Sequence, residues 1–578
     1  MNDIRRTILW VIFGFSMVLL WDQWQVHNGQ KATFFPSPSS AAKRVDAVAQ
    51  SDGVNQGASG AAANNTAIPT PSAQGAGAVP PLPATAAAAS QPPTDVVKAA
   101  GANAGERFVV ATNVLRVTFD TAGGSLVKAE MLAHADMENK TRSFVLFDDS
   151  TDRLYMAQTG LIGAGAQYPN HKTVMVASGA RVLPDGTDAL DIRFESPLLD
   201  GIRLVKTYTF KRSLYDIDVK HEIINNGTQV ASPQLYLQLI RDGNKPPGES
   251  AFYSTFTGPA VYTDAKKYEK VEFSDIEKGR AEFEKKANDG YIAIVQHYFA
   301  SAWLLANGIQ RDFFMRKVNA NLYAAGMITP AGDLAPGQSK TIEARLYAGP
   351  QIEKTLETLA PGFELVKDYG WLTILAKPLY WLLDKVQGYV GNWGWSIVAL
   401  VVLLKAAFYW LNAQAYRSMA KMKGINPRVM EMRERLKDKP QEMQQEMMRI
   451  YKEEKVNPLG GCFPILIQIP VFIALYWVLL SSVEMRNAPW ILWIKDLSSP
   501  DPYFLLPLLM AATTMFQTWL NPRPPDPMQA KLMWYMPLIF SVMFFFFPAG
   551  LVLYWLTNNI LSIAQQWVIN KQMGVLGK

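Results

Sequence analysis

One lysine in the middle of an apolar stretch is the residue of this sequence that most clearly points to chemistry. Lys405 lies twelve residues from Trp393 and twelve from Arg417, about 18 Å from each along a helix. A charge at that depth in a bilayer is costly, so such a lysine usually faces a water-filled cavity or a partner. The apolar stretches after residue 392 contain no Asp or Glu to pair with it. We therefore expect Lys405 to face a hydrated groove. The alternative, a lysine that reaches the interface and has no role, requires far more than the ~6 Å length of its stem.

Uncharged polar side chains in the same apolar stretches are candidates to share this groove. They are Gln414, Gln468, Thr513, Thr514, Gln517, Thr557, Asn558, Asn559, Gln565 and Gln566. Each of them alone more often forms a hydrogen bond between helices than a functional site. Together with Lys405 they predict a polar groove inside a small helical bundle, with Gln468, Gln517 and Asn558 as its polar lining.

The rest of the sequence lacks the residue patterns of catalysis, metal binding or nucleotide binding. Its five His are scattered, and its single Cys, Cys462, has no partner for a disulfide within the chain. We find no metal-ligand spacing, no nucleophile elbow and no Gly-x-x-x-x-Gly-Lys phosphate loop. These absences predict no metal and no cofactor, and they argue against an enzyme. The net charge of +6 permits nucleic-acid binding, but the distribution of that charge favours membrane topology instead, and we expect no DNA partner.

Five apolar blocks must position these residues, and they predict a polytopic α-helical membrane protein with six spans. A spanning helix needs about 20 mostly apolar residues. The last block is uncharged for the 39 residues between Lys531 and Lys571, and Pro548-Ala549-Gly550 divides it into two spans. The first block is expected to be an uncleaved anchor, because no small-x-small cleavage site follows Trp21. The predicted segments are an anchor at 1–24 and spans at 393–414, 461–483, 503–520, 532–547 and 551–570.

Lys and Arg gather in loops that lie on one side of the membrane if the chain crosses it six times. Eleven of them fall within 415–457, whereas 484–501 has two against three acidic residues. Because cytoplasmic loops carry the excess of positive charge, we expect both termini in the cytoplasm. The segments 415–460, 521–531 and 571–578 are then cytoplasmic, and the loop 484–502 is periplasmic.

The long segment after the anchor changes from a tether to alternating residues. Of the 54 residues from 51 to 104, 45 are Ala, Gly, Pro, Ser, Thr, Gln or Asn, which predicts a flexible tether over 25–104. From about Arg107 apolar residues recur with a period of two, and some fifteen such strands predict a large periplasmic all-β sandwich over 105–350. Two examples of a shared strand face are Ile202, Leu204, Tyr208 and Phe210, and Ile342, Ala344 and Leu346. Asn226-Gly227 predicts a hairpin turn.

Two further segments carry an amphipathic pattern. Residues 351–392 combine apolar residues at helical spacing with several Trp and Tyr, which predicts helices lying in the plane of the outer leaflet; packing against the sandwich is the alternative. Residues 415–460 predict a cytoplasmic helical hairpin, with a helix beginning at Asn426-Pro427 and a turn at Asp438-Lys439-Pro440. Its methionines are expected either to accommodate varied apolar partners or to form the seam of the hairpin itself. They include Met430, Met432, Met443 and Met447. The basic residues on the outside could meet RNA or anionic lipid.

Several short motifs resemble one known family over nearly the whole chain. They are Tyr416-Arg-Ser-Met-Ala-Lys-Met, the segment 454–464 (Glu-Lys-Val-Asn-Pro-Leu-Gly-Gly-Cys-Phe-Pro), Gln468-Ile-Pro, Ala488-Pro, Asp526-Pro-Met-Gln, the segment 547–554 (Phe-Pro-Ala-Gly-Leu-Val-Leu-Tyr), Asp368-Tyr-Gly-Trp and Gly391-Asn-Trp-Gly. With the order of anchor, tether and sandwich, these motifs are similar to the YidC membrane-insertase family of the longer Gram-negative type.

That resemblance implies an insertase and folding chaperone of the cell inner membrane. It would insert nascent inner-membrane proteins delivered by ribosomes, alone or beside the Sec translocon. The family has five core helices around a hydrophilic groove that is open to the cytosol and the lipid and closed outside. Its groove arginine corresponds to Lys405, and its aromatic residues at the groove exit correspond to Tyr554 and Trp555. The sandwich resembles sugar-mutarotase folds without implying their activity. The short tail, 571–578, argues against ribosome contact through a long basic tail.

Two other classes remain alternatives. A polytopic solute transporter or channel also crosses the membrane several times, but the five later spans show no obvious inverted repeat and contain a single ionisable group. A membrane-tethered enzyme that acts on sugars predicts that the sandwich alone carries the activity. Solute flux without protein insertion in proteoliposomes would favour the transporter.

Overall fold

The computed structural model describes residues 105–164, 166–246, 255–437, 439–454, 463–521 and 527–574. These residues form two compact units, a β unit that extends to Lys367 and a helical unit that begins at Asp368. The predicted anchor at 1–24 and tether at 25–104 lie outside the described residues.

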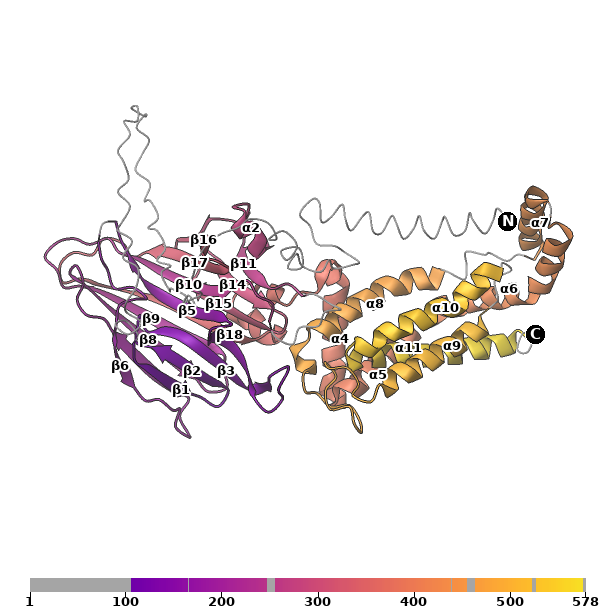
Figure 1. Ribbon diagram of the computed structural model, residues 1–578, viewed down its shortest axis with the longest axis horizontal. Helices are drawn as coiled ribbons and strands as arrows, with labels where there is room; N and C mark the ends of the chain where they lie inside the picture. The colour runs from indigo at the N-terminus through magenta and orange to yellow at the C-terminus, as the bar shows by residue number, and fades with distance from the viewer. Residues whose placement is uncertain are drawn as a thin grey trace, which may run out of the picture. The chain divides into compact units, whose positions relative to one another are not determined.

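The β unit is built from two antiparallel sheets of nine strands each, somewhat more strands than the fifteen expected (Figure 1). In sheet order, the first sheet contains β1 (Arg107–Ala111), β2 (Leu115–Asp120), β3 (Ser125–Ala135), β4 (Ser143–Asp149), β5 (Leu154–Ile162), β10 (Gln234–Asp242), β17 (Leu322–Pro330), β16 (Arg311–Asn319) and β13 (Lys286–Ala287). The second contains β12 (Lys267–Lys270), β11 (Gly258–Thr263), β14 (Tyr291–Gln296), β15 (Phe299–Leu305), β18 (Ser339–Pro350), β9 (Asp216–Asn225), β8 (Ile202–Lys211), β7 (Ala189–Glu195) and β6 (Val176–Gly179). Two short helices, α2 (Phe273–Glu277) and α3 (Glu353–Leu359), and a 3₁₀ turn at Phe363–Val366 belong to the same unit.

Alternating burial brings the two sheets together as a sandwich. In β7 the side chains of Leu190, Ile192 and Phe194 are buried while Asp191 and Arg193 between them are exposed, as the period of two predicts. Phe194 packs on Phe119 of the first sheet, with ring centroids 5.2 Å apart. The two predicted strand faces, on β8 and β18, are buried as expected. The all-β sandwich predicted from periodicity is therefore confirmed.

The hairpin predicted at Asn226-Gly227 is wrong. The strand before this dipeptide, β9, pairs with β8 and β18, whereas the next strand, β10, pairs with β5 and β17 in the other sheet. The dipeptide therefore opens a connection between the sheets. Asn225 holds this connection with its side chain, which donates to the carbonyl oxygens of Gln229 (2.8 Å) and Leu334 (2.7 Å).

Eight helices form the helical unit as far as the structure describes it (Figure 1). They are α4 (Thr373–Val390), α5 (Trp393–Ala407), α6 (Tyr409–Arg435), α7 (Pro440–Glu453), α8 (Phe463–Ser481), α9 (Leu505–Leu520), α10 (Pro527–Met543) and α11 (Ala549–Gln572), with 3₁₀ turns at Gly370–Leu372, Val483–Met485 and Phe544–Phe546. Helix α11 is central, because it packs against α5, α6, α8 and α9. Its first turn follows Pro548, where the sequence predicted that the last apolar block divides.

The predicted span 393–414 contains a break. Helix α5 ends at Ala407, Phe408 leaves the helical conformation with φ −94° and ψ 10°, and α6 starts at Tyr409. The two helices meet at a bend of 69°. Judged by length and mean hydropathy, no single helix among the described residues is long and apolar enough to cross a membrane, whereas α5 and α6 pass this test as a bent pair.

The hairpin forms, but its first helix begins earlier than predicted. Asn426-Pro427 does not start a helix, because α6 runs from Tyr409 through Pro427 to Arg435. The helix was predicted to start there because Pro fits a first turn; the packing of the hairpin holds the longer helix despite the lost backbone hydrogen bond. The return helix α7 begins at Pro440, the last residue of the predicted turn.

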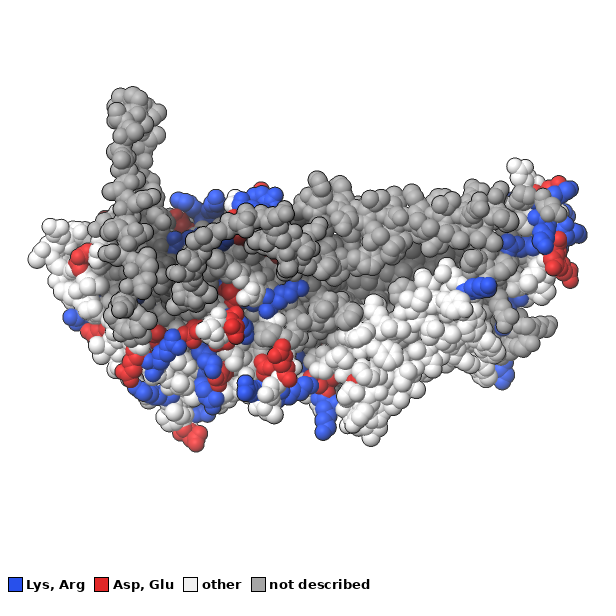
Figure 2. Space-filling model, viewed as in Figure 1, with Lys and Arg blue, Asp and Glu red and all other residues white. Residues whose placement is uncertain are grey.

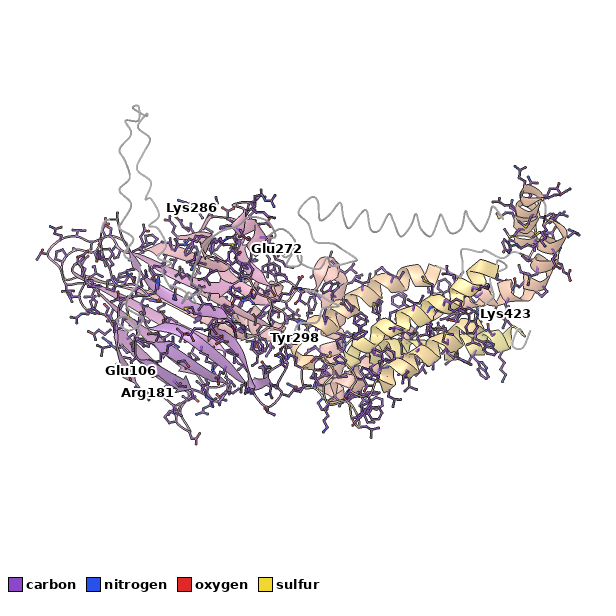
Figure 3. All side chains as sticks on the ribbon, in the orientation of Figure 1. Glu106, Arg181, Glu272, Lys286, Tyr298 and Lys423 are labelled. Atoms are coloured by element: carbon purple, nitrogen blue, oxygen red, sulfur yellow. The ribbon has the colours of Figure 1, made fainter. Side chains whose placement is uncertain are left out.

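Charged side chains are distributed unevenly over the helical unit. Figure 2 shows a large uncharged surface over α9 and α10, while Lys, Arg, Asp and Glu gather on the hairpin of α6 and α7. Lys423 stands on α6 toward this hairpin end (Figure 3). Exposed apolar side chains on α10 include Leu538 and Ile539, which is 65% exposed. An aqueous surface rarely carries so wide an apolar area.

Candidate functional site

A pocket beside the break between α5 and α6 brings together three of the predicted groove residues, Lys405, Gln468 and Asn558. Its lining combines Lys405 with three other polar residues and an apolar majority: Val401, Leu404, Lys405, Phe408, Leu411, Asn412, Gln468, Val471, Tyr554 and Asn558. Apart from Phe408 at the break, these residues come from α5, α6, α8 and α11. The cavity volume of about 40 Å³ has room for a few water molecules.

Lys405 is held by a hydroxyl group of the opposite helix. Its Nζ atom donates to the Oγ atom of Ser562 on α11 at 2.7 Å. Lys405 also lies in the last turn of α5, because the break follows three residues later. The last carbonyl groups of a helix carry a partial negative charge, which favours a cation in that turn. The positive charge thus has two neutral sources of stabilisation, and the apolar stretches after residue 392 contain no acidic residue.

The amide groups of Gln468 and Asn558 form the second polar element of the pocket. Gln468 Nε2 donates to Asn558 Oδ1 at 2.8 Å, which joins α8 to α11. The main-chain carbonyl oxygen of Asn558 accepts the hydroxyl proton of Ser562 at 2.7 Å. A continuous line of hydrogen bonds therefore runs from Gln468 through Asn558 and Ser562 to Lys405. These hydrogen bonds fix the positions of the polar side chains beside the apolar residues that line the pocket.

The two predicted aromatic contacts, Tyr554 and Trp555, take different positions. Tyr554 is buried and lines the pocket. Trp555, the next residue on α11, is half-buried and packs on Phe472 of α8 and Phe544, with ring centroids 4.4 Å and 5.2 Å apart. Trp555 therefore contacts the apolar groups beside the pocket and is not among the residues that line it.

Other predicted groove residues form bonds between helices. Asn559 donates to Thr514 of α9 at 2.9 Å, and Gln566 donates to Asn521 at 3.0 Å. Gln565 donates to the main-chain oxygen of Tyr409 at 3.1 Å, beside the break. Gln517 is half-buried on α9 and is not among the residues that line the pocket.

The methionines of the hairpin divide into buried and exposed groups. Met432 is buried with Val429 and Ile450 in a small core, and Met443 and Met447 pack against it. These three methionines form the seam of the hairpin, the second of the two roles expected. Met430 is 56% exposed and Met448 is 48% exposed, so these two remain available to a partner.

A loop closes the end of the bundle opposite the hairpin. Main-chain oxygens of Leu497 and Ser499 accept from the first N–H groups of α11, those of Gly550 (2.9 Å) and Ala549 (2.8 Å). The carboxylate of Asp501 accepts from the Leu506 N–H at 2.7 Å and the Trp493 indole at 3.0 Å. The loop thereby satisfies helix N-termini that would otherwise lack partners.

Ser562 and Asn412 belong to the site but were missed by the sequence prediction. A serine in an apolar helix usually bonds to the carbonyl four residues back, so it carries little signal alone. The spacing of four between Asn558 and Ser562 places them on the same side of α11, and this was the available clue. Asn412 lines the pocket because the bend at Phe408 redirects α6.

Comparisons with known proteins identify relatives over the full length. A family model described as "YidC periplasmic domain" matches residues 107–382, and one described as "60Kd inner membrane protein" matches residues 385–575. The "Membrane protein insertase YidC" of Cupriavidus necator is 54% identical over 575 residues, 99% of this chain and 98% of the relative. The protein of the same name from Janthinobacterium sp. (strain Marseille) is 50% identical over 588 residues, 99% of this chain and 100% of the relative. The solved "Active YidC insertase crystal structure with the first transmembrane domain resolved" is 18% identical, with a TM-score of 0.37 over 79% of this chain and 91% of that chain.

Proposed function

Since the chain belongs to the YidC family of membrane protein insertases, we propose that it inserts inner-membrane proteins into the bilayer through the pocket around Lys405. The observation that carries this proposal is the placement of Lys405 among apolar helices, where a serine hydroxyl holds its ammonium group and no acidic side chain of the described residues lines the pocket. A short hydrophilic end of a substrate, above all an acidic one, would be attracted into the pocket. No residue is assigned a catalytic role.

The apolar segment of the substrate would leave the pocket sideways. We place its route along α8 and α10, the predicted third and fifth spans. Exposed apolar side chains on both helices support this route, among them Ile469 on α8 and Ile539 on α10. Burial of about 20 apolar residues in lipid supplies the driving force, so the step needs no nucleotide.

Six spans with both termini in the cytoplasm give this route its direction. The hairpin of α6 and α7 then lies at the cytoplasmic entrance, and the loop of residues 484–502 closes the periplasmic end. Helix α4 fits the plane of the outer leaflet, because it buries Ala376, Tyr380 and Leu383 and exposes Trp381 and Tyr389. The β unit is the periplasmic domain, which matches the family model for this region.

Three partners follow from this arrangement. The hairpin would receive nascent chains from the ribosome, and the exposed methionines Met430 and Met448 would offer apolar contacts to a substrate or a partner. Sec translocon components would cooperate on longer substrates. The bilayer itself is the third partner, since it accepts the product.

Replacement of Lys405 tests the proposal directly. Two substrates that differ only in the charge of a short translocated tail, acidic or neutral, are inserted into proteoliposomes. Lys405→Met keeps the apolar stem and removes the charge, so it should slow the acidic substrate most. Lys405→Arg keeps charge and reach and should retain activity. Attraction at 4 Å with an effective dielectric constant near 20 is about 4 kcal/mol before desolvation costs, which is enough to bias entry. Equal slowing of both substrates by Lys405→Met would reject charge attraction.

A further inference from the structure

Resting on the proposed function, we infer that Ser562 is a positioning residue of the groove. Its hydroxyl group holds the ammonium group of Lys405 at one place in the pocket, and this placement determines how strongly an acidic tail is preferred. Ser562 lies on α11 and is 2% exposed, so bulk water does not replace it easily. The distance between Lys405 Nζ and Ser562 Oγ is 2.7 Å.

The hydrogen-bonding capacity of Ser562 sets the direction of this contact. A serine hydroxyl has one proton and two lone pairs. The proton is donated to the main-chain oxygen of Asn558 at 2.7 Å. Only acceptor sites therefore remain, and the Tyr416 hydroxyl of α6 also interacts with Ser562. An ammonium group can only donate, so the orientation imposed by Asn558 presents to Lys405 the acceptor that it needs.

A neutral acceptor is what a charge-based groove requires. A carboxylate at position 562 would form an ion pair with Lys405 and leave no net charge for a substrate. A serine supplies the hydrogen bond but no opposing charge. The carbonyl end of α5, in whose last turn Lys405 lies, adds a partial negative charge. The side chain is thus restrained while its positive charge remains available.

The same face of α11 also contacts the chain at the break between α5 and α6. Three residues after Ser562, Gln565 donates to the main-chain oxygen of Tyr409. Lys405 precedes the break at Phe408 and Tyr409 follows it, so α11 contacts both arms. Helix α11 therefore holds Lys405 through Ser562, and through Gln565 it holds the start of α6, the helix that leads into the hairpin.

The experiment compares insertion rates of the acidic-tail and neutral-tail substrates in proteoliposomes that contain equal amounts of the full chain. The ratio of the two rates should fall roughly three- to tenfold in Ser562→Ala, the range expected for one lost hydrogen bond. Ser562→Thr should restore the ratio, because threonine keeps the hydroxyl and its bond to the carbonyl four residues back. Ser541→Ala is the matched control: Ser541 is also buried and donates to the carbonyl four residues back, that of Pro537, at 2.7 Å. Ser541 is not among the residues that line the Lys405 pocket, so its replacement should leave the ratio unchanged.

The double variant separates positioning from general packing. In a Lys405→Met background, Ser562→Ala should cause no further change in the ratio. A further fall of the same size there, or an equal fall in Ser541→Ala, would overturn the positioning role. If Lys405→Met lowers the ratio but Ser562→Ala does not, the inference fails while the proposed function stands. If Lys405→Met leaves the ratio unchanged, the proposed charge attraction itself fails.

Discussion

Lys206 and His221 are direct cross-strand partners on β8 and β9, and both are completely buried between the sheets. Lys206 Nζ donates to the carbonyl oxygens of Gly123 (2.6 Å) and Thr159 (2.8 Å). His221 Nε2 lies 3.0 Å from the Thr159 hydroxyl oxygen. Burial lowers the pKa of Lys206 from 10.5 to about 7. Burial, and then the charge of Lys206, lower the pKa of His221 from 6.5 to about 3.

The stability of the β unit should therefore fall as the pH falls. Between about pH 10.5 and 7 the unfolded chain binds a proton at Lys206 that the folded chain binds less readily, so acid favours unfolding, by at most about 5 kcal/mol. Between about pH 6.5 and 3 His221 acts in the same direction. Thermal unfolding of the strand signal, followed by circular dichroism over this range, measures both windows.

Replacement of Lys206 measures how much this residue contributes to the pH dependence of stability. Lys206→Met should remove the slope between about pH 7 and 10.5, whereas Lys220→Met, at an exposed position of the neighbouring strand β9, should keep it. The slope of stability against pH is more informative than stability at one pH. In Lys206→Met the carbonyl groups of Gly123 and Thr159 also lose a hydrogen-bond donor, which lowers stability at every pH. A slope that survives Lys206→Met would assign the pH dependence to other groups.

Gly394 approaches Trp490 closely at the end of the bundle opposite the hairpin. The stability of this end should therefore be sensitive to a single added methyl group. A Cβ atom at Gly394 would overlap the indole of Trp490, which Asn392 also holds through its donation to the Trp490 carbonyl oxygen at 3.3 Å. Gly394→Ala should therefore cost about 1–3 kcal/mol of stability. Gly388→Ala on α4, where a Cβ would meet open space, is the control. Thermal melting in detergent compares the two, and equal melting temperatures would contradict the predicted overlap.

The seam of the hairpin predicts opposite results for two nearby methionines. Met432 is buried in the core of the hairpin, so Met432→Ala should loosen α6 against α7 and increase cleavage by a protease added to the side proposed to be cytoplasmic. Met430 is exposed, so Met430→Ala should leave cleavage unchanged and affect only the contact with a partner. Similar protection of both variants would mean that the seam does not hold the hairpin together.

Cysteine labelling tests the proposed orientation. In a Cys462→Ser background, single cysteines replace Asp185 in the β unit and Gln444 on α7, both exposed positions. A membrane-impermeant thiol reagent added to intact cells should label only the cysteine at 185, since 444 is predicted to be cytoplasmic. Labelling at 444 from outside would reject six spans with cytoplasmic termini.

Local patterns in the sequence were enough for the two-unit plan. Alternating apolar residues such as Leu190, Ile192 and Phe194 dictate strands with one buried face. Long uncharged blocks divided by Pro548 dictate apolar helices with a break between the last two. Lys405 stood out by type and position alone, because a lone charge in an apolar block is costly unless something solvates it.

Only the tertiary structure decided what solvates that charge. The break at Phe408 has no Pro or Gly beside it in the sequence, yet it ends α5 next to Lys405 and places helix carbonyl groups there. Ser562 lies 157 residues away and reaches Lys405 because α11 packs against α5. The turn signal at Asn226-Gly227 failed for a related reason: local preference permits a hairpin, but β10 pairs with β5 and β17. Hydropathy and turn preference are properties of neighbouring residues. Which distant groups meet depends on packing and on the need of each buried polar group for a partner, so these contacts emerge only when the whole chain is folded.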